Sequence, residues 1–158
     1  MTVHAGSLVW VDLLEEELDG SHSQILTCRL EPGGPEASAY VANSVAFLFS
    51  ALRGLHASGA EPRNVLIVIS AAETLESTQL PGHHALVQAA RGIVQSMTLE
   101  KPAGIGVINV ISHKGDGMDD IASTVRFLDS PGGGYLAGSW IGLDQAAWPA
   151  ADRQEGSA

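Results

Sequence analysis

The pair His83-His84 is the most suggestive group for chemistry in this sequence. Neighbouring imidazoles are candidates for metal binding or for proton transfer near neutral pH. Consecutive residues at the start of a helix point in different directions, however, and no Cys, Asp or Glu stands three or four positions from either histidine. The sequence therefore predicts no metal site here and favours surface or helix-capping histidines.

A thiol and a glycine cluster offer two other kinds of chemistry. Cys28 has no second cysteine to pair with and lies in an apolar run, which favours a buried, inert thiol over a nucleophile. The glycines 132–134 precede a predicted strand and not a helix, so they are typical of a turn rather than of a phosphate-binding loop. The sequence contains no P-loop, no GxSxG elbow and no HExxH motif.

The elements that must position these residues alternate along the chain. Apolar runs predict strands at Leu8–Leu14, Gln24–Leu30, Asn64–Ser70, Ala103–Ser112 and Trp140–Leu143. Apolar residues that recur at steps of three and four predict helices within Glu36–Ser58 and over Ala85–Glu100 and Ile121–Leu128. Ala71–His84 is expected to be a loop. Strands that alternate with helices indicate an α/β fold, with a parallel sheet of about five strands, helices on both faces and right-handed crossovers.

Carboxylates follow the first predicted strand. A nucleotide-binding α/β protein has a glycine-rich turn at this point, because backbone N–H groups at a helix N-terminus must approach the phosphates. This chain has Glu15, Glu16 and Glu17 after Leu8–Leu14, and they would repel a pyrophosphate. We therefore expect no nucleotide cofactor.

Composition and charge restrict the partners and the number of domains. The 158 residues carry a net charge of −10, which would repel nucleic-acid phosphates and anionic lipid, so neither nucleic acid nor a membrane is an expected partner. No apolar stretch approaches the roughly 20 residues needed to cross a bilayer. Together with the single cysteine, this predicts a cytoplasmic protein. One domain is expected over residues 1–145, followed by a flexible tail over 146–158.

Several spaced motifs between Tyr40 and Asp144 resemble the short-chain dehydrogenase/reductase family, and the β-ketoacyl reductases in particular. YVANSVAFLFSAL resembles the family helix that carries a catalytic Asn, here Asn43. NVLIVISA resembles the strand that ends in the catalytic Ser, here Ser70. The blocks GIVQSMTLE, GIGVINVIS and STVRFLDSPGGGYLAGSWIGLD resemble the later helix, strand and terminal segment. The resemblance implies a truncated Rossmann-like, or flavodoxin-like, sheet.

The same resemblance exposes two departures at the family's proton-transferring site. Counting back from GIVQSMTLE puts the family's catalytic Tyr at His83 and its Lys at Val87. A histidine can transfer a proton, but a valine cannot hold a nicotinamide ribose. The family's first βαβαβ half, with its dinucleotide turn, has no counterpart before Asn43. The chain is therefore predicted to bind neither NAD(H) nor NADP(H) and to use no other cofactor or metal.

What the resemblance retains are the elements through which subunits of the family pair. The helix within Glu36–Ser58 is apolar around most of its circumference, which also favours a subunit contact. We expect a non-catalytic subunit that assembles with a complete short-chain dehydrogenase/reductase, or with itself, and is not a monomer. The alternative is a stand-alone, cofactor-independent enzyme or ligand binder that acts on a small carbonyl or acyl-thioester through Ser70 and His83, helped by Asn43. The residues predicted at the interface are Val41, Val45, Leu48, Phe49, Leu52, Ile93, Met97 and Trp140.

Overall fold

The computed structural model of the protein describes residues 2–5, 8–59 and 61–143, with side chains from residue 13 onward. The predicted tail and Asp144 lie outside these residues. The strands are β1 (Thr2–Ala5), β2 (Gln24–Leu30), β3 (Arg63–Ala71), β4 (Ile105–Lys114) and β5 (Trp140–Gly142). The helices are α1 (Leu8–Glu17), α2 (Ala37–Ala57), α3 (Leu80–Glu100), α4 (Asp119–Asp129) and a short 3-10 turn, η1 (Gly133–Tyr135).

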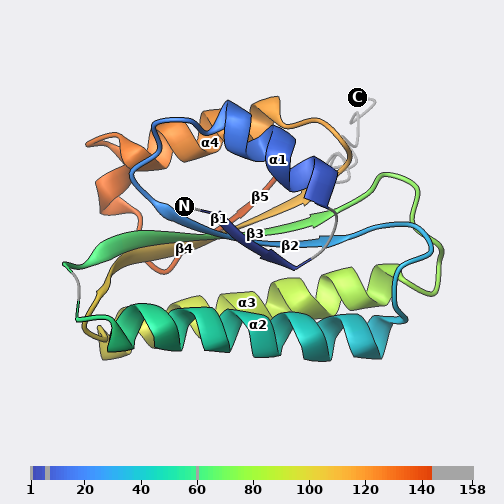
Figure 1. Ribbon diagram of the computed structural model, residues 1–158, viewed down its shortest axis with the longest axis horizontal. Coiled ribbons are helices and arrows are strands. Elements are labelled where there is room, and N and C mark those ends of the chain that lie inside the picture. The colour runs from blue at the N-terminus through green and yellow to red at the C-terminus, as the bar shows by residue number, and fades with distance from the viewer. Residues whose placement is uncertain (1, 6–7, 60, 144–158) are drawn as a thin grey trace, which may run out of the picture.

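The five strands form one parallel sheet in the order β1-β2-β3-β4-β5. Helices α2 and α3 cover one face and α1 and α4 cover the other (Figure 1). Each face has its own apolar core: Leu48, Leu52 and Leu86 pack below the sheet, and Leu14 and Ile121 pack above it. The predicted α/β class, with helices on both faces, is confirmed.

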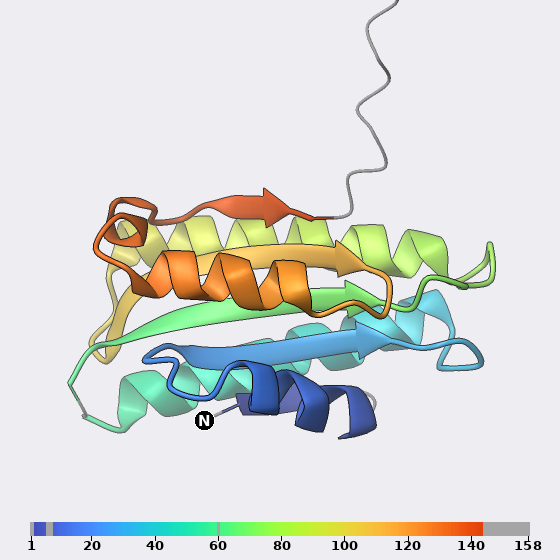
Figure 2. The same cartoon turned by 90° about the horizontal axis from the view of Figure 1, so that it is seen from above.

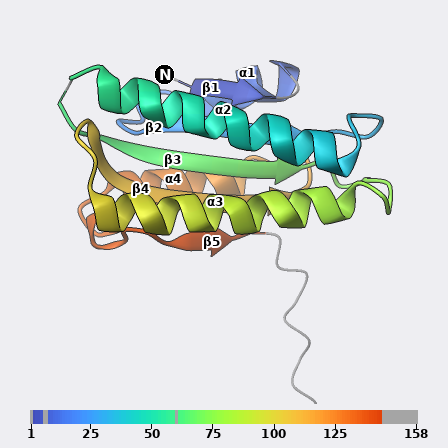
Figure 3. The same cartoon turned by 90° about the horizontal axis from the view of Figure 1, so that it is seen from below.

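The crossovers do not all have the predicted right hand. The strands step in one direction across the sheet, so helices on opposite faces require crossovers of opposite hand. The connections through α2 and α3 are right-handed (Figure 3), and those through α1 and α4 are left-handed (Figure 2). Left-handed crossovers are rare in parallel sheets. Their effect here is to cover both faces without reversing the strand order.

The strand predicted at Leu8–Leu14 is wrong, because this segment is the body of α1. Short apolar runs do not distinguish a strand from a buried helix. Leu14 and Leu18 are one helical turn apart and both are buried against α4, so the helical repeat continues through the acidic residues. The first strand is β1 instead. Glu15–Glu17 therefore do not stand at a strand-to-helix turn, and they give no reason to exclude phosphate binding.

Helix α3 begins at Leu80, five residues before the predicted start. Pro81-Gly82 suggested a loop, but proline is favoured in the first turn of a helix, where its missing N–H costs no hydrogen bond. Gly82 has a packing reason to be there, since a Cβ atom at this position would lie 2.9 Å from Cα and Cβ of Ala37. The two long helices thus touch backbone to backbone at their first turns.

Within the described residues, no helix is long and apolar enough to span a membrane.

Candidate functional site at the carboxyl edge of the sheet

At the carboxyl edge of the sheet, the helices that follow β3 and β4 lie on opposite faces, as do those that follow β1 and β2. The chain leaves β3 toward α3 on one face and leaves β4 toward α4 on the other (Figure 1). In open α/β sheets, the crevice between two such diverging connections is the usual place for a ligand. The two loops stay close at their roots, because the Gly115 amide donates to the Ala71 carbonyl at 2.8 Å.

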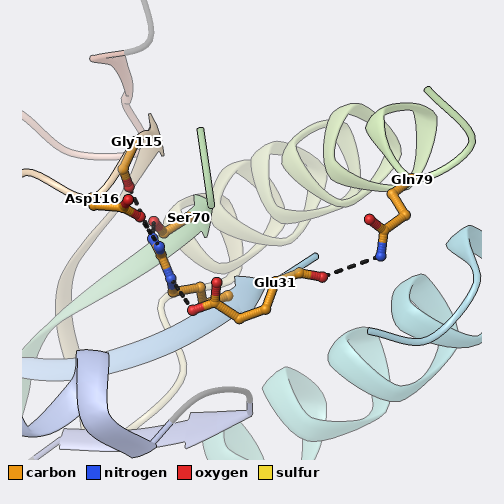
Figure 4. Close-up of polar contacts among 6 residues, drawn as sticks. Glu31, Ser70, Gln79, Gly115 and Asp116 are labelled. Carbon is orange, nitrogen blue, oxygen red and sulfur yellow. Dashed lines mark hydrogen bonds and ion pairs between the residues drawn. The ribbon is translucent and has the colours of Figure 1, made fainter. Parts of the chain in front are cut away.

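The side chain of Arg29, near the end of β2, contacts residues at the ends of β3 and β4. Figure 4 shows its partners Glu31, Ser70, Gly115 and Asp116. Its Nη1 donates to Ser70 Oγ at 2.8 Å and to the Gly115 carbonyl at 3.0 Å. Its Nε donates to Glu31 Oε1 and its Nη2 donates to Asp116 Oδ1, both at 2.6 Å. The guanidinium therefore joins the ends of three neighbouring strands. We call Arg29, Glu31, Ser70, Gly115 and Asp116 the Arg29 cluster.

Burial differs sharply within the Arg29 cluster. The side chain of Arg29 is 2% exposed, whereas those of Glu31 and Asp116 are 34% and 75% exposed. A buried charge is tolerated only when it is paired and hydrogen-bonded, and here two carboxylates, a hydroxyl and a carbonyl provide the acceptors. The guanidinium of Arg29 is thus buried, whereas the carboxylates of Glu31 and Asp116 are in contact with solvent.

Ser70, which the resemblance matches to the family's catalytic serine, belongs to this cluster. Arg29, Ser70 and His113 are register partners on β2, β3 and β4, so their side chains share the sheet face toward α1 and α4. The hydroxyl of Ser70 is fully buried and accepts the hydrogen bond from Arg29. The serine holds the buried cation in place.

The other predicted site residues lie elsewhere. His83 and Val87 are one turn apart on α3, and both are buried. Asn43 is exposed on α2, where the next residue, Ser44, faces the core instead. The structure thus exposes Asn43 and buries His83 and Val87.

The prediction of surface histidines is half wrong. His84 is exposed, but His83 is 1% exposed, because α3 starts early enough to place it on the core side of its first turn. The two rings are 5.9 Å apart between centroids and tilted by 51°. In the described part of the chain, no group of three or more His, Cys, Asp or Glu residues is arranged to hold a metal ion.

Cys28 is a buried thiol, as predicted. It lies on β2 beneath α2, where Ser44 and Tyr40 approach it. Burial raises the pKa of Cys28 to about 12, and a hydrogen bond with Ser44 opposes this only in part. Burial also raises the pKa of Tyr40, with the Cys28 charge as a smaller cause. The thiolate that a nucleophile requires is therefore not formed near neutral pH.

The predicted interface residues divide into two groups. Leu48, Leu52 and Ile93 are buried in the protein's own core, and Val41, Val45 and Met97 are partly buried against it. Phe49 and Trp140 are 49% and 45% exposed. The long apolar stripe of α2 is therefore covered largely by the sheet and α3, and a partner could contact only the outer edge of it.

Charge is distributed unevenly between the two helical layers. Glu100 is the sole carboxylate in α2 and α3, at the last residue of α3, and Arg53 and Arg91 are their cations. The opposite layer, α1 and α4, carries the acidic residues Asp12, Glu15, Glu16, Glu17, Asp119, Asp120 and Asp129. Much of the negative charge of the chain thus lies on one side of the sheet.

A cavity of about 360 Å³ opens at the opposite edge of the sheet, between the ends of α1 and α4. Several polar residues in and beside its wall contact one another: Ser21 and Ser23 donate to the Asp129 carboxylate at 2.7 and 2.6 Å, and Arg126 lies 3.7 Å from Glu17. These contacts connect the end of α1 and the segment after it to α4.

The sequence did not reveal the Arg29 cluster. The usable signal was a single arginine within the apolar run QILTCRL, followed two residues later by Glu31. A charged residue near the end of a buried strand requires a partner. That Ser70 and Asp116 are partners as well depends on the sheet register, which local sequence does not specify.

Three comparisons with known proteins gave one distant structural match. No family model matches the sequence, and no curated protein matches it either. Among solved structures, the chain is similar to an oxidoreductase of the short-chain dehydrogenase/reductase type from Brucella ovis, with 15% sequence identity and a TM-score of 0.46. The similarity covers 85% of this chain and 75% of the other. A likeness of this size carries no conclusion about what this chain does.

Proposed function

We propose that this chain is a non-catalytic subunit that assembles with a complete short-chain dehydrogenase/reductase and supports its activity. The observation that carries the first half of the proposal is the 2.8 Å hydrogen bond by which Arg29 engages the Ser70 hydroxyl. A serine that serves a substrate carbonyl must offer its hydroxyl to that substrate. Here the Ser70 hydroxyl accepts a hydrogen bond from a guanidinium of the same chain and is fully buried, so a substrate carbonyl has no access to its proton.

The residues at the other family positions support the same proposal. Val87 has no charge with which to lower a neighbouring pKa or to hold a ribose. His83 is buried on the core side of α3, and Asn43 is exposed on the outer side of α2. The chemistry of the family would need these side chains at one reacting centre.

Assembly is supported by the outer surface of α2 and α3. This surface exposes Phe49 together with small or uncharged residues such as Ala46 and Gln88. Helices that face only solvent normally carry charged residues on that side. The chain has a net charge of −10, but α2 and α3 carry few carboxylates. A protein partner that approaches this layer therefore meets the least electrostatic repulsion, which makes the layer suited to protein contact. The class of partner comes from the sequence resemblance, through blocks such as Ser123–Asp144.

The test starts from the genes beside that of this chain. A full-length short-chain dehydrogenase/reductase found among them is produced together with the chain, with an affinity tag on one of the two. We expect the two to copurify in a fixed ratio, and the NAD(P)H-dependent activity or the stability of the reductase to fall when the chain is omitted. Separate elution of the two proteins, with identical reductase activity and melting temperature, would refute the proposal.

The alternative of a cofactor-independent enzyme or ligand binder has less support. It requires Ser70 and His83 to act on one substrate, and both side chains are buried. Self-association without a reductase is a separate outcome of the same experiment, and light scattering distinguishes it from heteromer formation.

A further inference from the structure

We infer that the guanidinium of Arg29 takes the place of a bound ligand between the carboxyl ends of β3 and β4. It closes this place, which we call the crevice, to outside molecules. This goes beyond the proposed function, because it concerns the chain alone and would stand if no reductase partner were found. The first support is the location of the guanidinium. It lies where the connections of two adjacent parallel strands diverge to opposite faces, which is the general place for ligands in such sheets.

The second support is that the guanidinium makes the contacts that a bound polar ligand would make. Its acceptors come from three successive strand ends: Glu31 follows β2, Ser70 belongs to β3, and Gly115 and Asp116 follow β4. Nε, Nη1 and Nη2 all donate. A side chain that only needed to neutralise Glu31 would not have to reach across two further strands.

The third support is how far the cluster extends. The Glu31 carbonyl accepts a hydrogen bond from the Gln79 side chain at 3.2 Å, so the residue that binds Arg29 also anchors the start of α3 (Figure 4). The Ala72 amide donates to the Leu30 carbonyl at 2.9 Å, which ties β3 to β2 at the same level. The loops around the crevice are thus held in place by the chain itself. An outside ligand would have to displace a buried, paired cation.

The chemical class that fits the crevice follows from its walls. Removal of the Arg29 side chain would leave two carboxylates, a hydroxyl and a carbonyl, all of which accept hydrogen bonds. A planar guanidinium cation matches this set because it donates along several fixed directions in one plane, which a compact ammonium does not. We therefore expect the crevice to bind a small guanidinium cation when the Arg29 side chain is removed.

The experiment is chemical rescue of Arg29→Ala. We expect the variant to melt below the wild type, and guanidinium chloride at 20 mM to raise its melting temperature by at least about 3 °C, while sodium or ammonium chloride at 20 mM does not. The same guanidinium concentration should leave the wild type and Arg53→Ala, an exposed arginine on α2, unchanged or slightly lower. A folded Arg29→Ala protein that responds equally to all three salts would overturn the inference.

A second variant keeps the inference testable if Arg29→Ala does not fold. The double variant Glu31→Gln, Asp116→Asn retains the guanidinium and removes the charges that hold it. We expect hydrogen exchange at the Ala72 and Gly115 amides to accelerate at least tenfold, relative to amides in the middle of β3. Unchanged exchange at both amides would show that the cluster does not fix the crevice, and it would overturn the inference.

Discussion

The guanidinium carbon of Arg91, on α3, lies 4.6 Å from the ring centre of Trp140, on the edge strand β5. The indole Nε1 donates to Ser112 Oγ on β4 at 3.0 Å. The half-exposed tryptophan is therefore held from two sides, by a cation on one and a hydroxyl on the other. A large side chain fixed in this way presents the same surface to any partner, because little rotamer freedom is left to lose on contact.

Arg91→Ala should lower the free energy of unfolding by about 0.5–1 kcal/mol, the usual size of a cation–π contact at an exposed site. Urea unfolding of Arg91→Ala, Trp140→Leu and the double variant gives the coupling energy directly. Arg53→Ala serves as the control. A coupling energy within error of zero would mean that the contact contributes nothing in solution.

Ser70→Ala should destabilise the chain by about 1–3 kcal/mol, because it leaves a buried donor of Arg29 without its acceptor. Ser50→Ala, at an exposed position on α2, should change stability by less than about 0.5 kcal/mol. Urea titration measures both. If Ser70→Ala is as stable as the wild type, the hydroxyl is not a required part of the Arg29 cluster.

Phe49→Glu should prevent assembly without unfolding the chain. Phe49 is 49% exposed, so the isolated chain tolerates a carboxylate there, whereas burial of that carboxylate in an interface costs several kcal/mol. Phe127→Glu is a matched control, since Phe127 is 51% exposed but lies on α4, on the opposite layer. Size-exclusion chromatography with light scattering should show loss of the complex for Phe49→Glu alone. Equal loss for both variants would point to a general effect of added charge.

His83→Ala should change the activity of the reconstituted complex by less than about threefold. A working general acid or base contributes roughly 10²- to 10⁴-fold, so the two readings are far apart. Since His83 is buried, the melting temperature must be measured alongside, and His84→Ala provides an exposed neighbour for comparison. A hundredfold loss of activity with folding intact would favour the enzyme reading.

Stability should fall as the pH rises above about 9. Cys28 has a pKa near 9.0 when unfolded and about 12 when folded, so above pH 9 the unfolded chain releases a proton that the folded chain keeps. At pH 8 the thiol is protonated in both states, and its contribution to the free energy of unfolding is fully present. As the pH rises from about 9 toward 12, this contribution falls by about 1.4 kcal/mol per pH unit. Tyr40, whose pKa is also raised by burial, adds to the slope above about pH 10. Urea midpoints at pH 8, 9 and 10 should show a smaller decline for Cys28→Ala, and an equal decline would contradict this account.

The sequence predicted the parts of the fold in which each element carries its own periodic signal. The run at Gln24–Leu30 and the stripe within Glu36–Ser58 became β2 and α2 at nearly the predicted boundaries. The run at Leu8–Leu14 was ambiguous because a fully apolar run fits either period. Its helical identity depends on the contact of Leu14 and Leu18 with α4, more than a hundred residues away.

The site was harder to predict, because its residues meet through strand pairing. Ser70 could be named from its place at the end of a strand, but not its hydrogen bond with Arg29, 41 positions earlier in the chain. The burial of His83 depends on where α3 begins, and this is decided by the close approach of Gly82 to Ala37 on α2. In each instance the deciding contact is between elements.

The strand order also bears on how the sheet can be built during synthesis. Each strand after β1 pairs with the strand immediately before it in the chain, so none has to be inserted between two strands that are already paired. A nascent chain can therefore add one helix and one strand at a time to a single growing edge, and that edge always belongs to the strand made last. Pairing in the order of synthesis leaves little unpaired edge exposed to other chains while translation proceeds.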